Sequence, residues 1–286
     1  MSATIDTSID VRGRRGMRLP APVRRVLLAS IPIVVFLIIW QVATSLWLTQ
    51  ERLFPPPEVV FQEVWTIVGG EGPINSTYVD AGATARRILI AFAFAFVIGS
   101  GLGVLAGRHR LVFDFLSNPM WVAMAVPSVV WAFIFVVIFG TGDIVPILAL
   151  MALLIPNVTI VVAEGTKALS RELDEMALSY GTTGFQRLRE VYLPQLVPYL
   201  FSSARVAFSL AMKVAVVAEV IGLEEGIGYE LDYWYTQTVL APIAAWGLIL
   251  VAVGLAVDQL VFGPLERRVG RWRLASDEPT KAQEVV

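Results

Sequence analysis

The chain has 286 residues, of which 56% are hydrophobic and only 16% are charged, and its mean hydropathy is +0.70. This composition excludes an ordinary soluble domain and is typical of an integral membrane protein. The sequence contains no cysteine, which excludes disulfides and thiolate metal sites, and its net charge of -2 gives no indication of nucleic-acid binding.

Six segments are apolar enough to cross a bilayer, which takes about 20 residues. The first is too long for a signal peptide and lacks a small-residue cleavage site, so we expect it to remain as a spanning helix. The predicted fold is therefore an all-α membrane protein with six transmembrane helices, placed at Val26–Leu48, Ile88–Ala106, Met120–Phe139, Ile144–Ala163, Pro198–Val220 and Pro242–Phe262. We expect one transmembrane domain over residues 19–274, with its core at 83–265, between disordered cytoplasmic tails at 1–18 and 275–286.

The basic residues predict the orientation of these spans. Seventeen of the 22 lysines and arginines fall in the two tails, the loop after the second span and the polar segment after the fourth. The opposite loops are mostly acidic. Because basic loops stay in the cytoplasm, both termini and the polar segment are predicted to be cytoplasmic.

Two features precede the third span. Three prolines at 55–57 lead into a short apolar-faced helix from Glu58, which is expected to lie at the outer interface. In the second span, Gly99, Gly103 and Gly107 are four residues apart, which would let a neighbouring backbone approach closely. A phosphate-binding role for these glycines is disfavoured, because no strand precedes them and no Lys-Ser/Thr follows.

The polar segment Arg171–Pro194 predicts two short amphipathic helices. Leu173, Met176, Ala177 and Tyr180 recur at helical spacing and form one apolar face. Gly181 can end the first helix in a left-handed conformation, and Thr183 with Gln186 has the form of a capping box that starts a second. We expect Leu193-Pro194 to end that second helix.

The spacing from Glu175 through Gly181 to Leu193-Pro194 resembles the EAA loop of ABC importer permeases, with Met176 and Val191 as conservative departures from the motif. The match extends over roughly residues 53–273 and is similar to the nitrate/taurine/sulfonate branch. The resemblance implies a type I importer permease fold with a cytoplasmic coupling helix that contacts a separate ATPase subunit. The residues that it assigns to this contact are Glu175, Met176, Ala177, Tyr180, Gly181, Thr182, Thr183, Leu193 and Pro194.

The same resemblance implies a homodimer of permeases, two ATPase subunits and an extracytoplasmic solute-binding protein. The chain would then be a transport subunit of the bacterial inner membrane and not an enzyme. It contains no phosphate loop, so ATP and Mg²⁺ would be bound by the partner. Asp143, Glu224, Glu225 and Tyr229 would help to dock the solute-binding protein, although the aromatic residues of 222–240 also fit an interfacial belt.

The predicted fifth span contains three ionisable residues that are candidates for the translocation path or its gating: Arg205, Lys213 and Glu219. Lys213 either lines the path and attracts an anion, or pairs with an acid on another span or extends to the membrane surface. Glu219 has either a structural or gating role or is solvated at the outer surface. Asp258 is expected to be a solvated or paired helix end.

The predicted function is transport of a small anion, such as a sulfonate, taurine, nitrate, bicarbonate or an aromatic carboxylate. A secondary transporter driven by an ion gradient is the main alternative. It would need acids or broken helices near the middle of the membrane, and the predicted spans carry acids only near their ends. An inactive membrane scaffold is disfavoured by the intact loop.

Overall fold

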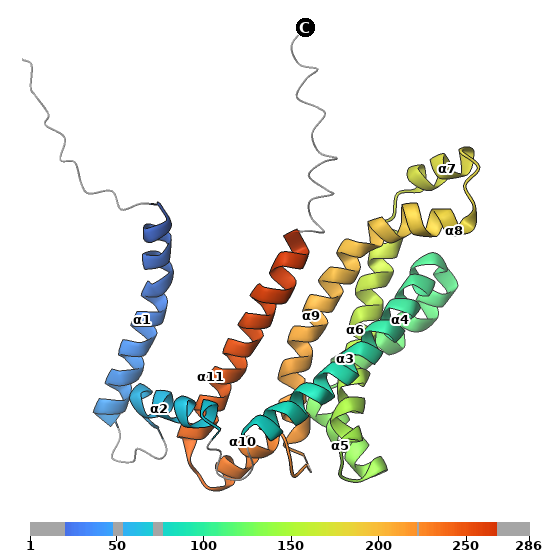
Figure 1. Ribbon diagram of the computed structural model, residues 1–286. Helices are drawn as coiled ribbons and strands as arrows, with labels where there is room; N and C mark the ends of the chain where they lie inside the picture. Colours follow the sequence, from blue (N-terminus) through green and yellow to red (C-terminus); the bar gives the residue numbers. More distant parts are fainter. Residues whose placement is uncertain (1–20, 48–53, 71–76, 222, 268–286) are drawn as a thin grey trace, which may run out of the picture. The chain divides into compact units, whose positions relative to one another are not determined.

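A computed structural model describes residues 21–47, 54–70, 77–221 and 223–267 of the chain (Figure 1). They belong to two compact units, of which the first contains α1 (Ala21–Trp47) and the second begins at Glu58. The predicted tails at 1–18 and 275–286 lie outside the described residues.

The second unit is built from helices that follow one another with short connections. In chain order they are α2 (Pro57–Val68), α3 (Thr77–Arg108), α4 (Arg110–Ala125), α5 (Ser128–Phe139), α6 (Ile144–Lys167), α7 (Arg171–Ser179), α8 (Gly184–Arg187), the π-helical turn η1 (Leu188–Tyr192), α9 (Leu193–Glu219), α10 (Ile227–Thr236), α11 (Leu240–Val257) and the π-helical turn η2 (Asp258–Phe262). The predicted helix from Glu58 is thus confirmed as α2, whereas its place at a membrane interface stays a prediction.

Four helical segments of the described chain are long and apolar enough to cross a membrane, and a bent pair would make a fifth. The four are Thr77–Arg108, Ile144–Lys167, Gly184–Glu219 and Leu240–Arg267. In α1, the apolar stretch Ser30–Leu46 is shorter than these. An all-helical, multi-pass membrane chain is confirmed, and the count of six spans stays a prediction.

The predicted third span, Met120–Phe139, is wrong as a single helix. Helices α4 and α5 meet at an angle of 95°, because Val126 is extended (φ -70°, ψ 125°) in front of Pro127. Proline disfavours the helical conformation of the residue before it and cannot donate a backbone hydrogen bond, so the helix is interrupted there.

Helices α3 and α6 pack closely along the predicted glycine positions. A Cβ atom on Gly99 would lie 2.8 Å from Val158 Cβ, and one on Gly103 would lie 2.7 Å from Val162 Cβ. Gly107 faces Thr166 in the same way, one turn further along. The backbone of α3 therefore rests directly on side chains of α6, which confirms the predicted close approach.

Helix α9 joins this pair to complete a three-helix core. Small residues of α3 and α9 pack against larger ones of α6, so the three helices interlock along their shared faces. The buried side chains are Ile88, Ala91 and Ala95 from α3, Leu150, Leu154, Val158 and Val162 from α6, and Ala207, Ala211 and Ala215 from α9. Helix α5 packs on α6 and α9 through Ala132, which is fully buried.

The expectation that Leu193-Pro194 ends the second short helix is also wrong. The helix runs without a break from Gly184 to Glu219, through η1 and α9. The π-helical turn just before Pro194 widens the backbone, so the proline ring avoids the carbonyl group one turn earlier. The side chain of Gln195 donates to the Val191 carbonyl at 2.9 Å, which satisfies one acceptor left over in the turn.

Candidate functional site

Helices α7 and α8 form a helical hairpin, residues 171–187, at one end of the second unit (Figure 1). Ser170 caps α7 by accepting from the Leu173 amide at 3.3 Å. Gly181 has φ +70°, and the amide that follows it, of Thr182, donates to the Ala177 carbonyl at 3.2 Å. Because glycine adopts positive φ at little cost, this Schellman ending confirms the predicted stop at Gly181.

The return helix of the hairpin starts at the predicted capping box. The Thr183 hydroxyl accepts from the Gln186 amide at 3.3 Å, and the Gln186 side chain accepts from the Thr183 amide at 2.8 Å. Arg187 of α8 then pairs with Asp174 of α7 at 3.5 Å. Local capping and one ion pair thus hold the two helices together.

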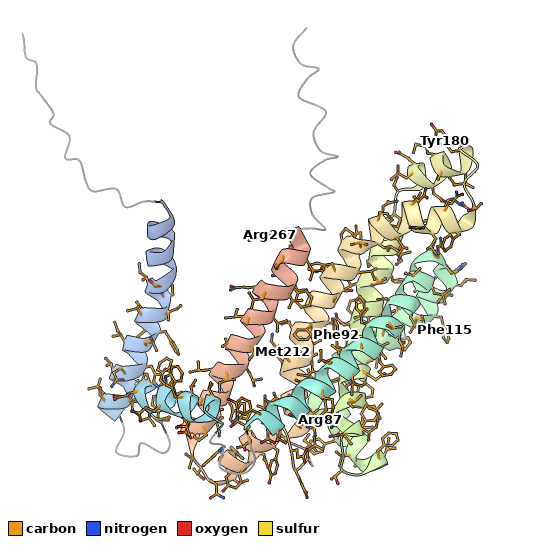
Figure 2. The ribbon with its side chains drawn as sticks, in the orientation of Figure 1. Arg87, Phe92, Phe115, Tyr180, Met212 and Arg267 are labelled. Atoms are coloured by element: carbon orange, nitrogen blue, oxygen red, sulfur yellow. The ribbon has the colours of Figure 1, made fainter. Side chains whose placement is uncertain are left out.

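The hairpin exposes apolar side chains. Met176 is 53% exposed, Phe185 71% and Tyr180 80%, and Figure 2 shows Tyr180 at the far tip of the hairpin. Of the predicted apolar face, only Ala177 is buried within the chain. Glu175 is exposed, and it takes part in none of the ion pairs found among the described residues. Such an apolar surface with a charge beside it is typical of a docking site.

A second candidate site, the Arg87 cluster, lies at the opposite end of the bundle, and Figure 2 labels Arg87 there. We use this name for Thr84, Arg87, Asp143 and Glu219. Arg87 is 2% exposed and donates to Glu219 Oε1 at 2.8 Å and to Asp143 Oδ1 at 2.8 Å. Glu219 is fully buried and also accepts from Thr84 at 2.7 Å. One arginine therefore connects α3, the turn before α6 and the end of α9.

The same cluster anchors the loop 223–228. The Arg87 guanidinium donates to the Glu225 carbonyl at 2.9 Å, and Glu219 accepts from the Gly228 amide at 3.1 Å. Asp80 accepts from the Gly226 amide at 2.7 Å, and Gly226 itself has φ +118°, which favours glycine. The loop is thus fixed by buried acceptors of α3 and α9.

Three of the four predicted docking residues meet beside this cluster. Asp143, Glu224 and Glu225 line one open cavity of about 460 Å³, together with Thr141, Gly142 and Leu223. The Asp143 side chain is 48% exposed and also pairs with Arg86. Tyr229 does not line this cavity. It lies in the first turn of α10, where it is partly buried.

The three ionisable residues predicted for the fifth span have different environments. Glu219 is buried in the Arg87 cluster, so solvation at a surface is excluded for it. Arg205 binds Asp258 through two bonds, Nε–Oδ1 at 2.6 Å and Nη2–Oδ2 at 2.7 Å, and binds Glu266 at 2.6 Å. Asp258 is therefore paired, as one of the two expected alternatives had it, but it lies inside the continuous helix Leu240–Arg267 and not at a helix end. Lys213 is exposed and takes part in none of the ion pairs found in the described part of the chain.

A comparison with protein families identifies the chain. Residues 99–271 match the family described as binding-protein-dependent transport system inner membrane component. The chain belongs to this family. The match covers the hairpin and the cores of α6, α9 and α11, where the sequence resemblance to importer permeases was found.

Curated relatives and solved structures agree with the family. The taurine transport system permease protein TauC of Escherichia coli (strain K12) is 27% identical over 254 residues, which are 87% of this chain and 90% of TauC. The nitrate import permease protein NrtB of Leptolyngbya laminosa is 25% identical, covering 90% and 95% of the two chains. A structure of the inward-facing MetNI methionine ABC transporter matches with a TM-score of 0.54 at 20% identity, over 72% of this chain and 96% of that one. TauC and NrtB are both named as permease proteins of transport systems.

Sequence reasoning missed three buried residues of this permease's second site. No pattern in the sequence singled out Arg87, Thr84 or Asp80 as site residues. A basic residue placed ahead of a long apolar run, with few acids nearby in sequence, was the available signal. Within the described residues, no three His, Asp or Glu side chains come together in a way that could hold a metal ion.

Proposed function

We propose that this permease forms the translocation path of an ATP-driven importer and receives its driving motion through the α7–α8 hairpin. The observation that carries the proposal is the exposure of Met176, Tyr180 and Phe185 on a hairpin whose own turn is rigidly capped. An exposed apolar surface on a well-ordered element favours a protein partner, and the family favours an ATPase subunit.

In this proposal both termini and the hairpin are cytoplasmic, as the distribution of basic residues predicts. Two copies of the permease would pair, and each hairpin would sit on one of two ATPase subunits, which bind ATP and Mg²⁺. The exposed Glu175 would meet a basic group of the ATPase, while Leu193 and Pro194 would lie just behind the contact in the continuous helix.

Helix continuity supports this transmission of movement. The hairpin leads into one helix that spans Gly184–Glu219, and this helix packs on α6 and α3 through the buried core. A displacement of α8 would therefore move α9 as a rigid body rather than being absorbed by a flexible joint. The displacement would also move Glu219 of the Arg87 cluster, which lies at the other end of α9.

At that other end we propose the docking of an extracytoplasmic solute-binding protein. The loop 223–228 and the turn at 140–143 are held rigidly by Arg87, and Asp143, Glu224 and Glu225 border an open cavity between them. Rigid loops with exposed charges give a partner a defined surface at low entropic cost. Tyr229 would contribute through α10 rather than through the cavity.

The solute is proposed to be a small anion. Relatives named for taurine, nitrate, bicarbonate and aliphatic sulfonates support this class, and an aromatic carboxylate also belongs to it. In the described part of α9, Lys213 supplies a positive charge that no carboxylate of the described residues neutralises. An anion would be attracted to such a charge in a low-dielectric span.

The proposal is tested by co-purifying the permease with its ATPase subunit and measuring ATP-dependent, vanadate-sensitive uptake in proteoliposomes. Glu175→Lys and Met176→Glu should each abolish co-purification and uptake. Glu190→Lys, which changes another exposed glutamate in the same polar segment, should leave both intact. Normal binding and uptake by both hairpin variants would refute the coupling role.

The secondary transporter is the alternative that this assay also addresses. The 95° break between α4 and α5 is a feature that such a transporter can have. The family match over residues 99–271 nevertheless favours the importer. Uptake that continues without ATP and is insensitive to vanadate would support the alternative.

A further inference from the structure

A cavity of about 540 Å³ lies between α9 and α11 and shares no lining residue with the hairpin or the Arg87 cluster. Figure 2 shows Met212, one of its lining residues, on the side of α9 that faces α11. The volume of the cavity is within the range of small-molecule sites in proteins, about 300–1,000 Å³. Most of its wall is apolar, made by Phe208, Met212, Val216, Leu250, Leu255 and Phe262.

The charges of this cavity are distributed unevenly. At one end, Arg205 is paired with Asp258 through two hydrogen bonds and with Glu266 through a third. Lys213 lies eight residues further along α9, which is about 12 Å at the rise of a helix. No ion pair of the described residues includes Lys213, so the cavity has an unpaired positive charge at its other end, away from Arg205.

A hydroxyl group lies beside that charge. Ser209 is four residues before Lys213, so both side chains occupy the same face of α9, and both line the cavity. Ser209 makes none of the side-chain hydrogen bonds found among the described residues. An ammonium group and a hydroxyl side by side suit the oxygens of a carboxylate or a sulfonate.

We propose that this cavity binds an organic anion with an apolar body as it passes through the permease. The anionic group contacts Lys213 and Ser209, and the apolar body lies against Phe208 and Met212. This inference rests on the proposed function and narrows its substrate class. Inorganic anions such as nitrate have no apolar body to place on these walls, so they gain only the contact with the charge.

A substitution at one glycine can fill the cavity and so test whether its volume is needed. Gly254 of α11 lines it, and a Cβ atom there would stand 3.6 Å from Met212 Sδ, an ordinary contact. A larger side chain at this position would therefore fill the cavity without straining the backbone. Gly247 is seven residues earlier on the same helix, has open space around it and does not line the cavity, so it is a matched control.

The charge is tested by labelling the full-length chain in proteoliposomes. The sequence has no cysteine, so Ser209→Cys introduces the sole thiol. An anionic methanethiosulfonate carrying a sulfonatoethyl group should react faster there than a cationic one carrying a trimethylammonium group. Lys213→Gln should lower this ratio of rates by about tenfold, the effect of one unit charge nearby, and Lys213→Arg should preserve it.

A thiol at Ser179 in the hairpin, introduced by Ser179→Cys, serves as the control for the reagents themselves, and its rate ratio should not respond to Lys213→Gln. The proposal is overturned if the rate ratio at Ser209→Cys also fails to change in response to Lys213→Gln. Slow labelling by both reagents in every Lys213 variant also overturns it, because the cavity would then be filled by lipid.

The apolar part of the ligand is tested by protection. Benzoate and 1-butanesulfonate should slow labelling of Ser209→Cys, and nitrate at the same concentration should not. Gly254→Phe should block labelling, whereas Gly247→Phe should leave it unchanged. Equal protection by nitrate would contradict an organic ligand.

These measurements need neither ATP nor a partner protein, so they can succeed even when the proposed coupling fails. Conversely, ATP-dependent uptake of an organic anion that is unaffected by Lys213→Gln and by Gly254→Phe would leave the proposed function in place and refute this site alone.

Discussion

Removing the positive charge of the Arg87 cluster is predicted to destabilise the permease far more than removing the neighbouring one. Arg87 and Arg86 are adjacent on α3 and both bind Asp143, but their exposures are 2% and 58%. Arg87→Met leaves Glu219 fully buried with only Thr84 and a backbone amide as donors. An uncompensated buried charge of this kind costs about 3–5 kcal/mol.

Arg86→Met should cost under about 1 kcal/mol, because Arg86 and Asp143 are both about half exposed and water can replace the lost ion pair. The free energy of unfolding, measured by titration of mixed micelles with denaturing detergent, should therefore separate the two variants by at least about 2 kcal/mol. Adding Glu219→Gln to Arg87→Met should recover a large part of the loss, because it removes the unpaired charge. Equal losses for the two arginines, or no recovery in the double variant, would refute this account.

Three further predictions concern the packing and the hairpin. Gly103→Leu should prevent correct folding, because its Cβ would lie 2.8 Å from the Thr159 carbonyl of α6. Gly101→Leu should be tolerated, because Gly101 has open space around it. Size-exclusion profiles of the two variants in detergent would test this difference. Gly181→Ala should destabilise the hairpin by about 1 kcal/mol, because alanine must adopt the positive φ of this position. Apart from its chain neighbours, no described atom lies within 4 Å of the new Cβ, so no steric clash adds to this cost. The variant should bind the ATPase subunit more weakly in a pull-down. Thr183→Ala should cost about 1 kcal/mol through loss of the capping box, seen as faster hydrogen exchange in α8, and unchanged exchange there would contradict this.

The hairpin could be predicted from the sequence because its signals are local. A glycine that must adopt φ +70° and a Thr-x-x-Gln capping box act over three or four residues, and neighbouring side chains complete the hydrogen bonds. Exposure of the apolar face could not be derived in the same way. It depends on whether other parts of the fold cover Met176 and Tyr180. None of the described residues does so, and only the three-dimensional arrangement reveals this.

The bend between α4 and α5 could not be predicted from proline alone. Pro119, Pro156 and Pro198 all lie inside continuous helices, and Pro127 ends one. The difference comes from tertiary packing, since α5 is held against α6 and α9 with Ala132 fully buried. That packing favours the bend, although the hydropathy pattern continues without a visible break from residue 120 to residue 139 and predicts one straight helix.

The Arg87 cluster could not be predicted because its members are far apart in the chain. Arg87 is 56 residues from Asp143 and 132 from Glu219, so no spacing rule connects them. The sequence placed the acids at a predicted surface, where each could be solvated. The fold instead brings them to one arginine, and the burial of Arg87 and Glu219 then requires that these two charges pair.

The two candidate sites are joined by a single helix, which continues through Pro194, where the sequence predicts a stop. At about 1.5 Å per residue, the helix Gly184–Glu219 extends roughly 54 Å, more than the thickness of a bilayer core. The π-helical turn at Leu188–Tyr192 lies directly before Leu193-Pro194, and the helix continues through both residues. Glu219, the last residue of that helix, is also one of the two acids that hold Arg87, so the proposed displacement of the hairpin would act directly on the anchor of the loop 223–228.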